Sequence, residues 1–413
     1  MKQILALAAI LTLLAMGPLG CGTLSSLDYA STGDEVTRLA CSGDVKAEAD
    51  ALAQPLIDSG HTPGIIVGVL MPDHTRRYFA YGVRDKTTGA RPDGHTLFPI
   101  GSVSKGFVAV AAAAQVQFGA LSWNDTLANC LPAGTPLSAD ARKITLVQLA
   151  SHTAGLPRQP NTLKVFVQLI GYFFTGSNFY RDMDGPYVLG YLAKFEAPDT
   201  IRPNYSNIGY AYLSHVLELR TGQPACILVE STVLKPLGLQ QTSYDPTRLP
   251  GWDARAHGYA GDEPRCMRRG SPVPDWQNTE ALRSSVGLYS CAEDLLTFAS
   301  AHLHGTGDAT RDAALRDTIQ KRADPPPFSP ALAWSLDTID GQTLVYQIGV
   351  MAGYTSYLGM DPRHKTAVVV LQNSVNFTDH VGHKLLLRMA RAADRLQNGT
   401  ESTTNCHDHA ETR

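Results

Sequence analysis

A serine and a lysine lie three residues apart within residues 98–105, which read FPIGSVSK. The Ala-rich run that follows predicts a helix from Ser102 to about Phe118, ended by Gly119. Side chains three residues apart leave a helix from the same face, so the Ser102 hydroxyl and the Lys105 amine can meet. Because a hydroxyl is a poor nucleophile until a base takes its proton, this spacing indicates nucleophilic catalysis.

The position of the lysine favours the role of a base. The N-terminus of a helix carries partial positive charge, which disfavours a cation in the first turn and so favours the neutral amine. Burial would lower the pKa of the amine further. The backbone N–H of Ser102 can also donate to the oxyanion that forms when the serine attacks a carbonyl. The alternative is that Ser102 only caps the helix and that Lys105 is a solvated surface residue.

A second polar cluster, Tyr205-Ser206-Asn207, follows Pro203 and precedes a helix predicted from about Ile208. Residues two apart in extended backbone face the same side, so the phenol and the amide can reach one cavity. A phenol near an ammonium can ionise in part and relay protons between the nucleophile and the leaving group. Alternatively, Asn207 caps the helix and Tyr205 is an ordinary surface aromatic.

The order and context of these two motifs resemble the serine β-lactamase and penicillin-binding-protein superfamily. The resemblance is to its class C β-lactamase branch, which includes AmpH-like D-Ala-D-Ala carboxypeptidases and related esterases. Other stretches agree in sequence and order, namely ITLVQLASHTAGLP at 144–157, PLGL at 236–239, SVGLYS at 285–290 and EDLL at 293–296. The resemblance runs from about residue 60 to about residue 390 and implies the β-lactamase/DD-peptidase-like fold.

The resemblance also assigns roles to individual residues. It implies that Ser102 is the acylated nucleophile, Lys105 its base partner and Tyr205 the proton relay. It further implies that Asn207 binds the amide side chain of the substrate. A second backbone N–H for the oxyanion is expected from Val350.

The third motif of the family is a strand that reads Lys or His, then Thr or Ser, then Gly. It corresponds here to Gln347, Ile348 and Gly349. Gly349 preserves the close backbone approach that lets the strand edge receive a substrate, whereas Gln347 lacks the charge that helps to hold a substrate carboxylate. Because charge-assisted hydrogen bonds are about twice as strong as neutral ones, this departure bears on substrate choice and leaves acyl chemistry untouched. Candidates for the missing cation are the loop residues Arg265, Arg268 and Arg269.

Strand patterns occur at both ends of the chain, and helical patterns lie between them. They predict an N-terminal hairpin and four C-terminal strands, at 65–71, 77–83, 331–338, 343–348, 354–360 and 366–372. Residues 121–283 are mostly helical in pattern, and a last helix is predicted at about 379–396. We therefore predict an α/β (α+β) fold in which one antiparallel sheet, built from both chain ends and flanked by helices, carries an inserted mainly helical lobe.

The N-terminus has the order of an export signal, with a basic start, an apolar run and small residues. Cys21 follows Leu19-Gly20 and resembles a lipidated cysteine, so both membrane attachment through Cys21 and plain secretion stay open. We expect an exported protein, either periplasmic or anchored to the membrane by a lipid. The predicted divisions are a signal peptide at 1–20, a tether at 21–50, the hydrolase domain at 51–395 with its lobe at about 121–283, and a polar tail at 396–413.

Composition narrows the partners. With 35 Lys and Arg against 38 Asp and Glu, the net charge is −3, and nucleic acid is not an expected partner. Neither a cofactor nor a metal is expected, because His302-x-His304 and the tail segment 406–409 lack the spacing of known metal sites. An oxidising compartment would allow disulfides, and Cys266 and Cys291 could close a loop; free buried thiols are the alternative.

The sequence thus predicts an exported serine acyl-hydrolase with a Ser102 acyl-enzyme. Its expected substrates are small-molecule β-lactams or D-Ala-D-Ala peptidoglycan peptides. One alternative is a carboxylesterase on the same fold, which the neutral Gln347 favours. Another is a catalytically silent penicillin-binding-like protein, against which the joint presence of Ser102, Lys105 and Tyr205 argues.

Overall fold

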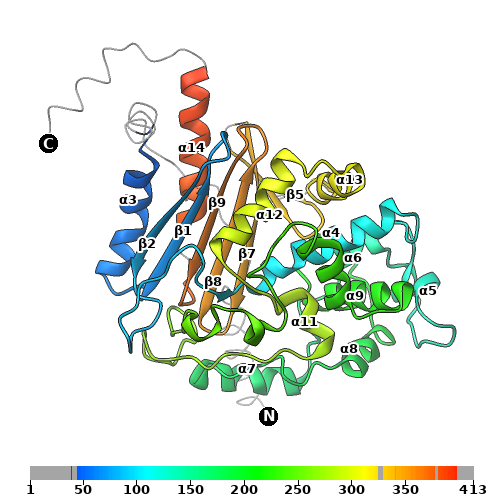
Figure 1. Cartoon of the computed structure of the whole chain (residues 1–413). Helices are drawn as coiled ribbons and strands as arrows, with labels where there is room; N and C mark the ends of the chain where they lie inside the picture. The colour runs from blue at the N-terminus through cyan, green and yellow to red at the C-terminus, as the bar shows by residue number, and fades with distance from the viewer. Residues whose placement is uncertain (1–38, 40–43, 324–328, 340, 377–379, 398–413) are drawn as a thin grey trace, which may run out of the picture.

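One antiparallel sheet of seven strands joins the two ends of the chain. In this computed structural model the described residues are 39, 44–323, 329–339, 341–376 and 380–397. The strand order is β2-β1-β9-β8-β7-β6-β5. The N-terminal strand β1 (Gly64–Leu70) pairs with β2 (Arg76–Gly82) on one side and with β9 (Thr366–Gln372) on the other. The predicted sheet built from both chain ends is therefore confirmed (Figure 1).

The C-terminal strands differ from the prediction at one place. They are β5 (Ser329–Pro330), β6 (Ser335–Ile339), β7 (Gln342–Met351) and β8 (Tyr354–Asp361). The strand predicted at 331–338 is broken, because Ala333 has a φ of 72° and cannot continue an extended backbone. The break brings the Ala333 carbonyl next to β7, where it accepts a hydrogen bond from Gln347.

Helices cover both faces of the sheet. Alternate residues of β1 face opposite sides, so Val67 packs against α3 (Val45–Asp58) and α14 (Val381–Gln397), while Ile66 belongs to the core under α12 (Ala292–His304). Figure 1 shows α3 and α14 on one face and α12 with the helical lobe on the other.

Helix α3 begins inside the segment that was predicted to be a tether. The Asp44 side chain accepts a hydrogen bond from the N–H of Ala47 and so caps the helix start. A buried ion pair of 2.8 Å between Glu48 and Arg388 then joins α3 to α14. Helix α3 thus occupies part of the predicted tether, and Leu39 is buried in the same core cluster.

The predicted helical lobe is present. Its helices are α5 (Leu127–Cys130), α6 (Leu146–Ala150), α7 (Leu163–Thr175), α8 (Gly185–Leu192), α9 (Asn207–Thr221), α10 (Ala225–Val229) and α11 (Glu280–Val286). Between the lobe and the sheet lies α4 (Ser104–Gln117), in which 11 of 14 residues are buried. An apolar helix enclosed on most sides holds its first turn rigidly, and that turn carries the predicted nucleophile.

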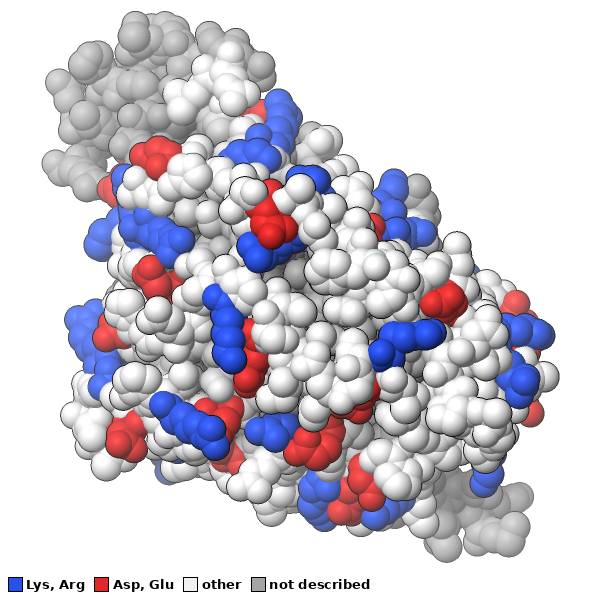
Figure 2. Space-filling view, turned by 45° about the vertical axis from the view of Figure 1, so that its right-hand side comes forward, with Lys and Arg blue, Asp and Glu red and all other residues white. Residues whose placement is uncertain are grey.

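The surface carries charges of both signs. On the face shown in Figure 2, basic and acidic side chains are interspersed over the described residues. Within the described part of the chain, no helix combines the length and the apolar character needed to cross a membrane.

Cys266 and Cys291 do not form the disulfide that the sequence allowed. Both thiols are free, as are those of Cys130 and Cys226. Cys291 is buried at the start of α12, whereas Cys266 is exposed on a loop whose backbone is tied to α7. Cys21, Cys41 and Cys406 lie outside the described residues.

Candidate active site

The predicted nucleophile and base meet in a buried turn. Ser102 lies in the short 3-10 turn Gly101–Val103, which leads directly into α4, and neither end of this turn has a side-chain cap. Lys105 Nζ lies 3.3 Å from Ser102 Oγ and also donates to the carbonyl of Ser285 at 3.3 Å. Ser102 is 3% exposed and Lys105 0%. A capping serine with a solvated lysine is therefore the wrong description of this pair.

The tyrosine of the second motif lies against the same lysine. Lys105 Nζ is 5.1 Å from the centre of the Tyr205 ring, and the Tyr205 hydroxyl oxygen is buried. A second tyrosine, Tyr210, lies at 5.8 Å, but its hydroxyl donates to the carbonyl of Ala150. Burial raises the pKa of Tyr210 well above its ordinary value, which keeps this phenol protonated. Of the two phenols, Tyr205 is the one suited to moving a proton.

Asn207 does not serve as a helix cap. Ser206 caps α9 instead, since its hydroxyl accepts from the N–H of Gly209 at 2.9 Å. The Asn207 side chain is 3% exposed and donates through Nδ2 to the Tyr180 hydroxyl at 3.0 Å. Its amide oxygen is buried and has no hydrogen-bond partner among the described residues. A ligand N–H could satisfy this acceptor.

Two glycines bring the edge of β7 against the nucleophile turn. A Cβ on Gly349 would lie 2.0 Å from the carbonyl oxygen of Ile100. A Cβ on Gly101, which has a φ of 51°, would lie 2.8 to 3.0 Å from the backbone of Val350. Only glycine permits contacts this close. The backbone of Val350 thus runs beside Ser102, as a second oxyanion donor requires.

The same stretch of β7 has an open edge. Strand β6 pairs with β7 from Gln342 to Tyr346 and no further. From Gln347 to Met351, β7 pairs with β8 on its other side and with no strand on this side, as far as the structure describes the chain. Unpaired backbone groups at a strand edge can bind an extended ligand.

Gln347 does not face the open edge. Its Nε2 donates to the carbonyl of Ala333 at 3.1 Å, and the side chain is 4% exposed. If Gly106 carried a Cβ, the Gln347 Oε1 would lie 3.5 Å from it. The Gln347 side chain is therefore packed beneath α4 and beside Trp334. The residue that replaces the family's cation is thus neutral and packed behind the nucleophile helix.

Two of the three loop arginines that were candidates for the missing cation are held by other groups. Arg269 is held by Asp262 at 2.6 Å and by the His61 carbonyl at 2.9 Å. Arg265 is held by Glu263 at 2.6 Å. These two cations therefore stabilise their own loop, and Arg268 is exposed on the same loop.

Sequence reasoning missed a cation that does lie at the site. The guanidinium carbon of Arg158 is 5.1 Å from the centre of the Tyr205 ring, and its carbonyl accepts the N–H of Asn207 at 3.0 Å. The adjacent Gln159 accepts a hydrogen bond from Tyr180 at 3.4 Å, which links it to Asn207. The sequence could have indicated this position, because Arg158 and Gln159 directly follow the scaffold stretch that ends at Pro157.

His152 supports the second motif as a neutral group. Its Nδ1 accepts the N–H of Ser206 at 3.1 Å, and its ring lies 4.5 Å from the Tyr205 ring. Burial, with smaller effects from the charges of Lys105 and Arg158, lowers the pKa of His152 to about 3. The imidazole is therefore uncharged at neutral pH and holds the backbone next to Tyr205.

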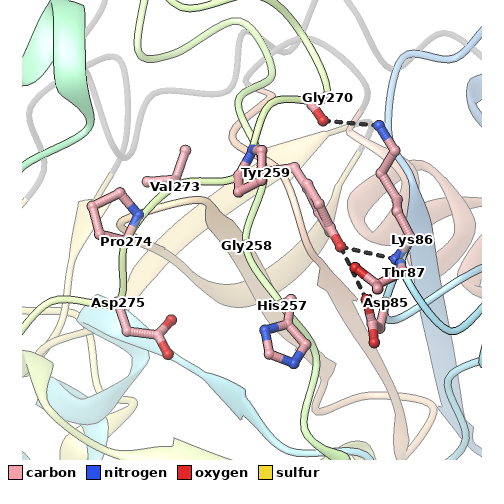
Figure 3. A pocket seen from close by; sticks show the side chains of 11 residues that line it. Asp85, Lys86, Thr87, His257, Gly258, Tyr259, Gly270, Val273, Pro274 and Asp275 are labelled. Atoms are coloured by element: carbon pink, nitrogen blue, oxygen red, sulfur yellow. Dashed lines mark hydrogen bonds between the residues drawn. The ribbon is translucent and has the colours of Figure 1, made fainter.

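A groove with both polar and apolar lining residues lies next to the β7–β8 hairpin, where Gly258 contacts Tyr354. It has a volume of about 610 Å³ and is lined by residues that include Asp85, His257, Tyr259 and Asp275 (Figure 3). The Tyr354 hydroxyl donates to Asp275 at 2.9 Å, which fixes the turn between β7 and β8 against this groove. No cluster of three or more metal-ligating side chains occurs in the described parts of the chain.

Comparisons with known proteins agree with this geometry. A family model described as Beta-lactamase matches residues 49–391. A β-lactamase of Lysobacter lactamgenus is 29% identical over 261 residues, which cover 62% of this chain and 60% of the relative. Penicillin-binding protein 4 of Amycolatopsis lactamdurans is 27% identical over 333 residues, covering 76% of this chain and 81% of the relative.

The fold also matches solved structures. The crystal structure of a class C β-lactamase from Rhodobacter sphaeroides superposes with a TM-score of 0.69 at 22% identity. The superposition covers 83% of this chain and 99% of that structure. The chain spans less than two thirds of the length of some relatives, as the 60% for the Lysobacter protein shows.

Proposed function

The chain belongs to the β-lactamase family, and from that premise we propose that it is an exported serine hydrolase that forms an acyl-enzyme at Ser102 with β-lactams or D-Ala-D-Ala peptides. One observation carries the proposal, namely the buried approach of Lys105 Nζ to Ser102 Oγ at 3.3 Å. Names of relatives support the substrate classes, since they include β-lactamases, a penicillin-binding protein and putative D-alanyl-D-alanine carboxypeptidases.

The proposed acylation step uses the groups described above. Ser102 Oγ attacks the carbonyl carbon of the substrate while its proton passes to Lys105. The oxyanion accepts hydrogen bonds from the N–H groups of Ser102 and Val350, which stabilise the tetrahedral intermediate. When the C–N bond breaks, Tyr205 delivers its proton to the leaving amine and takes back the proton that Lys105 holds. A water molecule then attacks the acyl carbonyl and passes one proton, by way of the same groups, to Ser102 Oγ as the acyl C–O bond breaks. The acid product leaves and the Ser102 hydroxyl is restored.

A carboxylesterase activity is the second candidate. Its support is Gln347, which is neutral and turned towards α4, together with Ile348 in the place of a hydroxyl. Without a cation on the strand, a substrate gains less from a carboxylate in its leaving group. A neutral ester loses nothing by this change.

Export is part of the proposal and rests on the sequence. The basic start and the apolar run of residues 4–16 support a signal peptide, and Cys21 supports either lipidation or secretion. The mass of the mature N-terminus distinguishes a lipidated Cys21 from a plain cleaved chain. An uncleaved Met1 in the mature protein would refute export by this route.

Covalent labelling tests the proposed function. The protein is incubated with a fluorescent penicillin and, separately, with a short-chain nitrophenyl ester, and intact-protein mass spectrometry detects the adduct. We expect an acyl adduct on the wild type and none on Ser102→Ala, because the substitution removes only the attacking hydroxyl. An adduct that persists on the alanine variant would remove Ser102 from the mechanism. The relative rates with penicillin and with the ester distinguish a β-lactam or peptide hydrolase from a carboxylesterase.

A further inference from the structure

The side-chain amide of Asn207 is bonded at one atom and open at the other. Its Nδ2 donates to the Tyr180 hydroxyl oxygen at 3.0 Å, and the residue is 3% exposed. Its Oδ1 is buried and accepts no hydrogen bond from the residues that the structure describes. Because buried polar atoms nearly always have a partner, Oδ1 is the atom of Asn207 that suits a donor brought by a ligand.

Asn207 is the first residue of α9, and the start of this helix packs against the nucleophile pair. Lys105 Nζ lies 5.1 Å from the centre of the Tyr205 ring and 5.8 Å from the centre of the Tyr210 ring. Asn207 stands between these two tyrosines in the sequence, and the same amine lies 3.3 Å from Ser102 Oγ. The first turn of α9, which carries Asn207, therefore borders the place where the proposed acyl-enzyme forms.

The hydrogen bonds of the Tyr180 hydroxyl have a defined direction. A hydroxyl has a single proton to donate, and the proton of Tyr180 goes to Gln159 Oε1 at 3.4 Å. The phenol oxygen is therefore left to accept, and the group that donates to it is Asn207 Nδ2. Such an acceptor pairs with the NH2 end of a carboxamide and not with its oxygen, so Asn207 Oδ1 is turned away from the phenol.

The phenol is itself held on several sides. The N–H of Tyr180 donates to Asn178 Oδ1 at 2.8 Å. The Tyr180 ring packs against Phe179 and Trp276, with 4.1 Å and 6.2 Å between ring centres. Trp276 is fixed in turn, because its indole N–H donates to the carbonyl of Gly176 at 2.8 Å. A side chain held through both its backbone and its ring can keep a neighbouring amide in one orientation.

We propose that Tyr180 is a positioning residue, whose hydroxyl holds the Asn207 amide so that Oδ1 accepts an N–H from the acyl part of the substrate. The preferred acyl donors then carry an N–H close to the carbonyl that Ser102 attacks. Without the Tyr180 hydroxyl the amide can turn over and present its NH2 group, which cannot accept a hydrogen bond. The inference rests on the proposed acyl-enzyme at Ser102 and deepens it by naming the residue that sets this preference.

Two esters that differ by one group test the inference. The 4-nitrophenyl ester of N-acetylglycine carries an N–H where 4-nitrophenyl levulinate carries a CH2, and the two molecules are otherwise identical. The second-order rate constant for release of 4-nitrophenolate, which reports acylation, is measured for both on the wild type and on Tyr180→Phe. We expect the ratio of the acetylglycine ester to the levulinate to fall about two- to tenfold in the variant, because one neutral hydrogen bond to the substrate is lost.

A double-mutant cycle shows whether Tyr180 acts through Asn207. Asn207→Ala removes the acceptor, so its ratio should be low, and the addition of Tyr180→Phe should not lower it further. Tyr212→Phe is the matched control, because Tyr212 is a buried tyrosine of the same lobe whose hydroxyl donates to the carbonyl of Val188 at 2.7 Å. This control should leave the ratio at its wild-type value.

An equal slowing of both esters in Tyr180→Phe would overturn the inference, because Tyr180 would then support only the shape of the lobe. A ratio that Tyr180→Phe also lowers in the Asn207→Ala protein would overturn it as well, since the effect would not pass through Asn207. If neither ester forms an adduct at Ser102 of the wild type, the proposed function fails and the positioning role falls with it. An adduct at Ser102 with an unchanged ratio would refute the role of Tyr180 alone.

Discussion

At the scale of single residues, the site depends on a lysine that sits in an unfavourable place. Lys105 is fully buried in the first turn of α4, where the helix dipole and the loss of solvent both oppose its charge. Its amine contacts the Ser102 hydroxyl and the Ser285 carbonyl. A structural lysine would gain little from this position, whereas a base needs the neutral form that the position favours.

Removal of either proton-transfer group should separate rate from stability. We expect Lys105→Ala and Tyr205→Phe each to lower turnover by about a hundredfold or more, since positioned proton transfer contributes at least that much. Thermal unfolding followed by circular dichroism should show a much smaller change, above all for Tyr205→Phe, which keeps the ring that His152 contacts. Near wild-type turnover in either variant would mean that another group serves as the base or relay.

The residues of the two motifs could be predicted from the sequence, but their neighbours could not. Ser102 and Lys105 are three apart on one helix, so their contact follows from helix geometry. Arg158 and Tyr205 are far apart in the sequence, and only the packing of the lobe brings them together. The sequence also did not indicate that the Gln347 side chain points towards α4. This direction depends on the positive φ of Ala333, whose carbonyl accepts the hydrogen bond, and on the absence of a side chain at Gly106.

At the scale of elements, the close contact between β7 and the nucleophile turn would set the position of the oxyanion in the proposed mechanism. Gly101 and Gly349 are the two positions at which this contact excludes a side chain. The hairpin of β7 and β8 is held on the side away from the site by the Tyr354 hydroxyl, which donates to Asp275 and lies within hydrogen-bond distance of the Ala256 carbonyl oxygen. Strand β7 is thus held by the nucleophile turn on one side and through Tyr354 on the other.

Gly349→Ala should damage activity through the position of the strand. A Cβ there would lie 2.0 Å from the Ile100 carbonyl oxygen, so β7 must move away from Ser102. Overpacking of this kind costs about 1–3 kcal/mol of stability. A displacement of about 1 Å at the reacting groups can lower the rate about a hundredfold. Steady-state kinetics and urea unfolding measure the two effects.

A second glycine provides the control. Gly190 lies inside α8, where a Cβ would have no atom within 4 Å, and its φ is not in the left-handed region. Gly190→Ala should therefore leave the rate unchanged and stabilise the helix by up to about 1 kcal/mol. Wild-type kinetics in Gly349→Ala would show that the approach of β7 to Gly101 is not needed for catalysis.

The prediction of elements succeeded where apolar runs and turn residues marked strands. The runs of β1 and β9 are buried throughout, and both were located to within one residue or two. The start of α3 was missed because its first turn, Val45 to Glu48, mixes apolar and charged residues without a clear period. The helix is fixed by the Asp44 cap and by the ion pair of Glu48 with Arg388. That pair joins distant segments, so no local pattern in the sequence indicates it.

At the scale of the whole molecule, buried neutral histidines tie stability to pH. Burial lowers the pKa of His302 from 6.5 to about 4, and His302 contacts Phe298 and Thr318 rather than an acid. The pKa of His152 is lowered in the same direction. A histidine with a lowered pKa in the folded state binds its proton more weakly there than in the unfolded chain. Stability is therefore full above pH 6.5 and is lost as the pH falls from 6.5 towards 4.

The pH dependence can be measured on His302, whose ring packs against Phe298 and Trp334 in the core. Urea unfolding at several pH values should show a loss of about 1.4 kcal/mol per pH unit for each such histidine within this window. His302→Gln removes one titrating group, so the slope should become shallower by that amount even if the variant is less stable at every pH. An identical slope in the variant would show that carboxyl groups alone govern the acid lability.

The pairing of β1 with β9 has a consequence for how the chain reaches its native state. Ile65 is opposite Gln372, so the centre of the sheet joins residues that lie more than 300 positions apart in the sequence. Contacts of such long range form slowly, because the entropy cost of closing a large loop comes before the contact can stabilise the chain. Until β9 arrives, the hairpin of β1 and β2 exposes apolar side chains that α12 and α14 later cover. A growing chain therefore stays open to proteases and to aggregation until its last strand has been synthesised.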